Sequence, residues 1–170
     1  MAVTYKLIQT VSVTAVGGNA NIEFLSIPQI YTDLFLVYSG RSARAAGGDD
    51  LYIRFNGLST NLSSRTMNGT GSATASYSDA SVAYVGYLPG DTATSSVFGN
   101  GSIYIPNYMA SVAKSISGDA VNENNAVAAT QQFAAGLWNS TAAITQINIY
   151  ALNGNLKQYS SASLYAIKNS

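Results

Sequence analysis

The sequence predicts an all-β protein, an antiparallel two-sheet sandwich of about nine or ten strands with jelly-roll connectivity. Short apolar runs alternate with polar residues at a period of two, turn residues separate these runs, and no segment has a convincing helical period. The 170 residues fit a single domain, 1–170, and no internal repeat indicates a propeller or a solenoid.

The first half of the chain contains four predicted strands, which cover residues 3–15, 20–25, 33–39 and 51–56. In the first, the apolar residues at odd positions from Tyr5 to Val13 share one face. The third is the most continuously apolar run, which predicts a central position in a sheet. The fourth ends at the pair Asn56-Gly57, a strong hairpin-turn signal.

The second half contains six predicted strands, at residues 82–88, 102–106, 110–117, 127–137, 143–152 and 161–167. Turns are expected at 89–91, Asn100-Gly101 and 153–155. The run 127–137 is rich in alanine, which favours a helix, but its larger side chains recur at a period of two. We therefore expect a strand there.

The stretch 58–80 differs from the rest because it holds Ser, Thr, Asn and Gly with few apolar residues. Core packing cannot explain its length, so we expect a long surface loop that contacts another molecule. The neighbouring loop 41–50 is a second candidate for that contact.

The composition argues against an enzyme. The chain has no histidine, no cysteine and eight acidic residues, so the usual groups for acid-base, nucleophilic and zinc chemistry are scarce or missing. Glu23 and Glu123 are the only glutamates, and nothing in the pattern pairs them as a glycosidase requires. Asp49-Asp50, with Asp91 and Asp119, could offer oxygen ligands to calcium, but these residues lack the alternating spacing of an EF-hand-like calcium loop. We expect no catalytic residue, no metal and no cofactor.

Charge is also informative. Eight basic residues balance eight acidic ones, and 9% charged residues is low, so self-association meets little electrostatic resistance. We expect neither nucleic acid nor a membrane as partner, because no basic patch and no long apolar run is present. The sequence starts without a basic and apolar leader pattern, so we expect synthesis in a cytoplasm.

Ten segments of the chain carry a family resemblance, and they cover residues 4–8, 26–28, 31–34, 41–42, 51–57, 98–99, 103–108, 114–115, 136–138 and 163–170. Together they resemble small virion proteins of tailed bacteriophages, and the resemblance runs through nearly the whole chain. Relatives of this kind have Gly where Ala166 stands, a change that concerns strand geometry alone.

The resemblance implies a β-sandwich that acts as a capsid decoration (cement) protein or as the terminal module of a tail fibre. We expect a decoration protein that binds the major capsid protein on the outer head surface as a homotrimer. No stalk-like repeat is present to support a fibre tip. The alternatives are a receptor-binding module that recognises a host glycan and a free lectin-like protein.

Five residues are candidates for an interface. Arg41, Arg44 and Arg54 form the basic cluster, and guanidinium groups make specific bidentate pairs with carboxylates of another subunit. Solvated surface ion pairs are the ordinary alternative. Tyr52 and Tyr77 belong to a set of twelve tyrosines, which suit protein interfaces and also stack on sugars. Tyr77 is the nearest aromatic platform for a glycan in the expected loop.

Overall fold

A computed structural model describes residues 4–125 and 129–168 and confirms the predicted all-β class, with two antiparallel sheets. The described residues form twelve strands, more than the nine or ten expected, and no helix. The jelly-roll connectivity stays a prediction.

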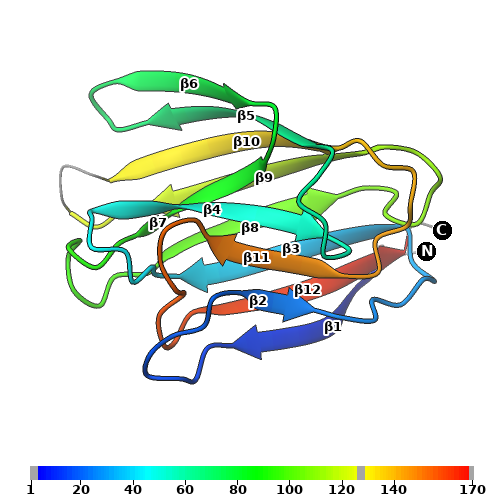
Figure 1. The fold of residues 1–170 in the computed structure, drawn as a ribbon, viewed down its shortest axis with the longest axis horizontal. Coiled ribbons are helices and arrows are strands. Elements are labelled where there is room, and N and C mark those ends of the chain that lie inside the picture. Colours follow the sequence, from blue (N-terminus) through cyan, green and yellow to red (C-terminus); the bar gives the residue numbers. More distant parts are fainter. Residues whose placement is uncertain (1–3, 126–128, 169–170) are drawn as a thin grey trace.

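The larger sheet has eight strands, and the smaller has four (Figure 1). In spatial order, the larger sheet consists of β1 (Thr4–Ser12), β12 (Ser161–Lys168), β3 (Asp33–Gly40), β8 (Gly99–Ile105), β9 (Lys114–Asn122), β10 (Thr130–Trp138), β5 (Leu62–Gly69) and β6 (Thr74–Asp79). The smaller sheet consists of β2 (Ile22–Phe24), β11 (Ile147–Ala151), β4 (Gly48–Phe55) and β7 (Ala83–Pro89).

The core lies between the two sheets. Leu34 and Leu36 of β3 are fully buried, as are Ile53 and Phe55 of β4. The Phe55 ring lies 5.4 Å from the Trp138 ring between centroids, so an aromatic pair joins the sheets. Each such side chain contributes about 1.5–3 kcal/mol through removal from water. The central position predicted for 33–39 is confirmed, since β3 pairs with both β12 and β8.

The first strand departs from strict alternation. A bulge between Leu7 and Gln9 shifts its pairing with β12, so the odd positions change face part-way along β1. Leu7 is therefore half exposed, whereas Val13 is buried. The prediction that one face carries all the odd apolar residues from Tyr5 to Val13 was wrong for this reason.

The stretch 58–80 is not a long loop. It forms β5 and β6, which pair with each other in a hairpin, and β5 also pairs with β10. Sequence patterning missed β6 because all six of its residues are exposed, so no apolar face marks the strand.

Further boundaries differ from prediction, among them the start of the strand expected at 143–152, since β11 begins only at Ile147. Asn100 and Gly101 lie inside β8 and pair with β9, so the expected turn there was wrong. The strand expected at 110–117 begins only at Lys114. The alanine-rich segment 127–137 forms a strand, β10, which pairs with β5 and with β9. The first two residues of the expected strand, 127 and 128, lie outside the described residues.

The two sheets differ in width, and this difference shapes the surface. The strand β7 forms one edge of the smaller sheet and packs over β9 and β10, while β5 and β6 lie at the top of Figure 1, beyond that edge. Part of the inner face of the larger sheet is therefore not covered by the smaller one.

Candidate functional site

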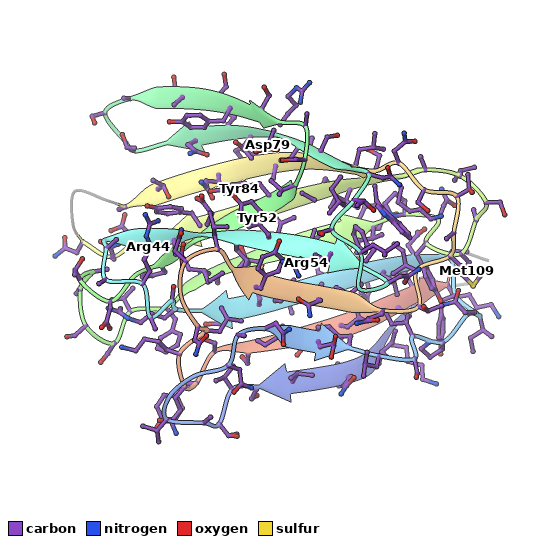
Figure 2. The ribbon with its side chains drawn as sticks, viewed as in Figure 1. Arg44, Tyr52, Arg54, Asp79, Tyr84 and Met109 are labelled. Atoms are coloured by element: carbon purple, nitrogen blue, oxygen red, sulfur yellow. The ribbon has the colours of Figure 1, made fainter. Side chains whose placement is uncertain are left out.

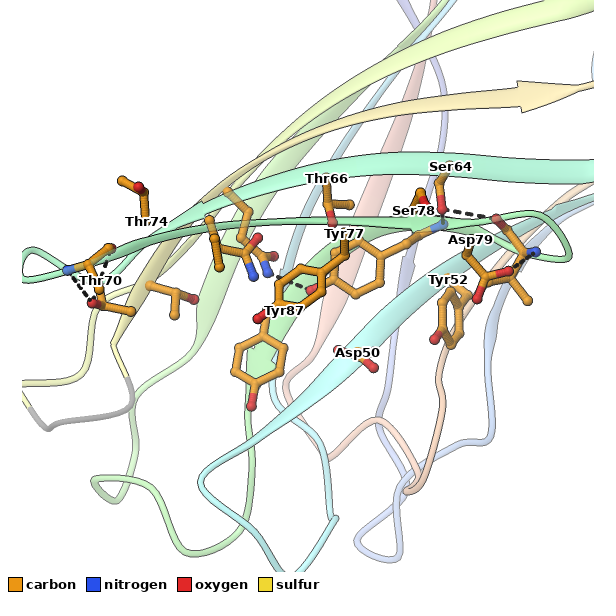
Figure 3. Close-up of a pocket in the computed structure, with 17 residues that line it drawn as sticks. Asp50, Tyr52, Ser64, Thr66, Thr70, Thr74, Tyr77, Ser78, Asp79 and Tyr87 are labelled. Atoms are coloured by element: carbon orange, nitrogen blue, oxygen red, sulfur yellow. Dashed lines mark hydrogen bonds between the residues drawn. The ribbon is translucent and has the colours of Figure 1, made fainter.

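The uncovered inner face forms one wall of a groove with a volume of about 610 Å³ (Figure 3). Thr66 and Asn68 of β5, Tyr77 and Asp79 of β6 and Gln132 of β10 line this wall. The other wall is the edge of the smaller sheet, lined by Asp50 and Tyr52 of β4 with Tyr84 and Tyr87 of β7. The volume lies in the range of about 300–1,000 Å³ that small-molecule sites occupy.

Four tyrosines give the groove its apolar surface. Tyr52 and Tyr84 are opposite each other on paired strands, and their rings meet edge to face at 5.8 Å between centroids. The Tyr87 ring lies against Gly48, where a side chain on residue 48 would collide with it. Tyr77 comes from the opposite wall and is 60% exposed, so its ring is open to an incoming molecule.

Gln132 is the most deeply buried polar side chain that lines the groove, at 1% exposure. Its Nε2 donates a hydrogen bond of 2.5 Å to the Tyr84 hydroxyl, which joins the two walls. Its Oε1 has no hydrogen-bond partner among the described residues, nor have Asn68 Oδ1 and Thr130 Oγ1 in the same lining. Unpaired buried acceptors are costly, and here they are gathered beside one cavity.

The charge of the lining is negative, because it includes Asp50 and Asp79 and no lysine or arginine. Burial, with the nearby Asp49 charge, raises the pKa of Asp50; the Arg44 charge and hydrogen bonds from Tyr84 and Tyr52 oppose that shift. Hydrogen bonds from the Ser81 hydroxyl and backbone N–H lower the pKa of Asp79, which therefore stays ionised.

Tyr52, Tyr84 and Tyr87 remain protonated at neutral pH. Burial is the largest cause of a raised pKa at all three: the pKa of Tyr52 rises to about 12, and the pKa values of Tyr84 and Tyr87 rise above the ordinary value. Their hydroxyls can therefore both donate and accept hydrogen bonds.

The structure brings together two of the five predicted site residues. Tyr52 and Tyr77 line opposite walls of the groove. Arg54 lies elsewhere on β4, with its guanidinium carbon 3.9 Å from the centre of the Tyr150 ring. Arg44 lies at one end of β4 (Figure 2), where it donates to the Gly48 carbonyl and lies 3.6 Å from the Asp49 carboxylate.

Arg41 has an internal structural use. It is buried at 5% exposure, and its guanidinium donates to four backbone carbonyls of the segment after β7. Those carbonyls belong to Asp91, Ala93, Thr94 and Val97, at 2.7–3.4 Å. Arg41 therefore fixes the conformation of that segment, and its donors are already used within the chain.

The carboxylates considered for calcium or hydrolysis lie apart. Asp49 is buried and accepts hydrogen bonds from the Ser42 hydroxyl and from Asn153, so it fixes a turn. Glu23 is on β2 in the smaller sheet, whereas Glu123 follows β9 in the larger one. In residues 4–125 and 129–168, no three His, Cys, Asp or Glu side chains are grouped to hold a metal ion.

A second surface feature is a row of directly paired residues on the outer face of the larger sheet. The row, which we name the apolar row, consists of Leu7, Tyr165, Phe35 and Tyr104 on four neighbouring strands. Leu7 is 50% exposed and Tyr104 37% exposed, and Tyr5 packs edge to face on Phe35 beside them. The row carries no charge.

No protein-family model matches this chain, and no curated protein matches it. Within the described part of the chain, no helix is long and apolar enough to cross a membrane. The arrangement offers two surfaces that can bind, the groove and the apolar row.

Sequence reasoning missed most of the groove. Tyr84 and Tyr87 were not singled out, and Asp50 was considered only as a calcium ligand, because the proximity of these residues depends on how β4 and β7 pair. Gln132 did carry a signal, since it occupies a position of β10 that faces inward, together with Ala134 and Trp138. A glutamine on the buried side of a strand needs a partner, and this marks it as unusual.

Proposed function

We propose that this protein is a capsid decoration protein of a tailed bacteriophage, which binds the major capsid protein on the outer surface of the head as a homotrimer. It is made in the host cytoplasm and performs no catalysis. The resemblance to small phage virion proteins supports the virion address, and the low charge of the chain supports self-association.

The apolar row is the observation that carries the self-association. Aromatic residues are enriched in protein interfaces and charged residues are depleted at interface centres, and the row has both properties. We assign the row to contact with a second copy of this chain. A closed cyclic trimer buries such a row on every copy.

Light scattering on the purified protein tests the assembly. The wild type is expected to have the mass of a trimer, and Leu7→Glu is expected to give a folded monomer, because a charge there would be desolvated in the contact. Leu152→Glu is the matched control, since Leu152 is 49% exposed and lies after β11 in the smaller sheet. A monomeric wild type that does not assemble on capsids either would refute the proposal.

The position of the protein on the virion tests whether it binds the head. Antibody labelling seen by electron microscopy should mark the head, and particles stripped of the protein should release their genome at lower temperature, because binding stabilises the capsid by mass action. Labelling of the tail alone with unchanged release would favour the second candidate.

That second candidate is a receptor-binding module of a tail or head fibre, which recognises a host-surface glycan. One observation favours it, the tyrosine-lined groove with unpaired buried acceptors.

A further inference from the structure

We propose that the groove between the β5–β6 hairpin and the β4–β7 edge binds an uncharged hexopyranose unit of a glycan. This site gives the receptor-binding candidate its ligand class. It does not depend on self-association through the apolar row, which lies on the outer face of the same sheet.

The tyrosines supply the apolar part of the match. A pyranose ring has one or both faces covered by C–H groups, and aromatic faces pack against such surfaces. Tyr77 and Tyr87 come from opposite walls and both line the cavity (Figure 3), so a ring that enters between the walls meets an aromatic side chain from each. The 60% exposure of Tyr77 leaves that ring free to take part.

The buried acceptors supply the polar part. Gln132 Oε1, Asn68 Oδ1 and Thr130 Oγ1 are buried and unpaired, and each can accept a hydrogen bond. A sugar carries several hydroxyl donors around its rim, next to its apolar faces. Such a ligand would satisfy acceptors that the protein alone leaves without partners.

The charges select against acidic sugars. Asp50 and Asp79 give the lining two carboxylates, and no lysine or arginine of the lining offsets them. Asp79 is held ionised by the Ser81 hydrogen bonds, so its charge persists at neutral pH. A sialic or uronic acid would meet like charge, whereas the hydroxyl groups of a neutral sugar donate hydrogen bonds to the carboxylates.

A quaternary ammonium group is the competing ligand, because four tyrosines and a carboxylate also form an aromatic cage. The unpaired acceptors separate the two possibilities. A quaternary ammonium has no hydrogen to donate and would leave Gln132 Oε1 unpaired, so the neutral sugar accounts for more of the lining.

Calorimetric titration and saturation-transfer NMR on the full chain test the site. The probes are methyl glycosides of glucose, galactose, mannose and N-acetylglucosamine, with N-acetylneuraminic acid and choline as charged comparisons. At least one neutral glycoside is expected to bind in the millimolar range and to shift tyrosine ring resonances. N-acetylneuraminic acid is expected not to bind.

Two variants place the binding in the groove. Tyr77→Ala should weaken binding by about fivefold or more through loss of the exposed ring. Gln132→Met should weaken it by about tenfold or more, because the ligand hydroxyl loses its acceptor. Tyr159→Ala is the matched control: Tyr159 is 76% exposed between β11 and β12, outside the groove lining, and its loss should leave the dissociation constant within about twofold.

Three outcomes would overturn the assignment: no neutral glycoside binds, choline alone binds, or Tyr77→Ala leaves the affinity unchanged. Tyr77 is exposed on an edge strand, so its variant should fold even where Gln132→Met does not. Light scattering on the same samples reports the oligomeric state, so failure of the sugar site and failure of the decoration proposal give different results.

Discussion

The hydroxyl of Tyr38 occupies the space where a methyl group on Gly86 would stand. Tyr38 belongs to β3 of the larger sheet and Gly86 to β7 of the smaller one, so this contact sets how closely the two sheets approach. The hydroxyl is buried and has no hydrogen-bond partner among the described residues.

This contact predicts a coupled pair of mutations. Gly86→Ala alone should lower the free energy of unfolding by about 2–3 kcal/mol, because the new methyl group collides with the hydroxyl. Tyr38→Phe should be neutral or stabilising by about 1 kcal/mol, since it removes an unpaired polar group. In the Phe background the alanine should cost at least about 1 kcal/mol less, as measured by urea denaturation in a double-mutant cycle. Additive effects would contradict the contact.

Arg41 should be a strong determinant of stability. Arg41→Met is expected to lower the free energy of unfolding by about 3 kcal/mol, because four carbonyls lose a charged donor. Arg41→Lys should rescue little of this, because an ammonium cannot reproduce the planar fork of the guanidinium. Limited proteolysis should then cut within residues 90–98. Arg65→Met is the control, exposed on β5, with an expected cost below about 0.5 kcal/mol.

Lys114 is a buried lysine that joins the connection before β9 to the connection after β10. It is 1% exposed, and its ammonium donates to the carbonyls of Ala110 and Ala142 at 2.8 and 2.6 Å. It also lies 5.7 Å from the ring centre of Trp138, its partner across the β9–β10 pairing. Lys114→Met should cost about 2–3 kcal/mol. It should also shift the emission of Trp138, the only tryptophan in the chain. The exposed Lys6→Met should change neither.

Buried tyrosines predict a loss of stability at alkaline pH. Burial first, and the Asp119 charge second, raise the pKa of Tyr38 well above its usual value, and burial raises that of Tyr84 as well. Above about pH 10 the unfolded chain releases these protons and the folded chain keeps them, so the unfolding free energy falls as pH rises, by up to about 1.4 kcal/mol per pH unit for each group. Urea midpoints from pH 8 to 12 measure this fall, and Tyr38→Phe should flatten it. An equal slope in that variant would contradict the burial effect.

Sequence patterning predicted strands wherever one face of the strand is apolar. The strand predicted at 51–56 corresponds to β4, and the segment rich in alanine is the strand β10. The larger side chains on which the second prediction rested, such as Phe133, lie on the exposed face of β10, whereas Gln132 and Trp138 lie on its buried face. The β6 strand has no buried face, so the period-two signal on which such predictions depend was absent.

The candidate site was predictable only in part, because its residues meet through tertiary pairing. Tyr77 was recognised as a possible sugar platform, but its neighbours Tyr84 and Tyr87 lie on a strand whose place beside the hairpin no local pattern encodes. The burial of Lys114 and Arg41 could not be predicted from the sequence either. Both residue types are almost always at the surface, and only the surrounding carbonyls explain their burial.

The β6 strand lines the proposed ligand groove but contributes almost nothing to the core. All six residues of β6 are exposed and the strand hydrogen-bonds to β5, so substitutions in 74–79 remove almost nothing from the core and should mostly stay within about 0.5 kcal/mol. Substitutions in 74–79 can therefore accumulate during evolution, because they scarcely affect folding stability. A lineage that carries this fold can vary this part of the groove lining through changes in one short strand, while the opposite wall and the core stay fixed.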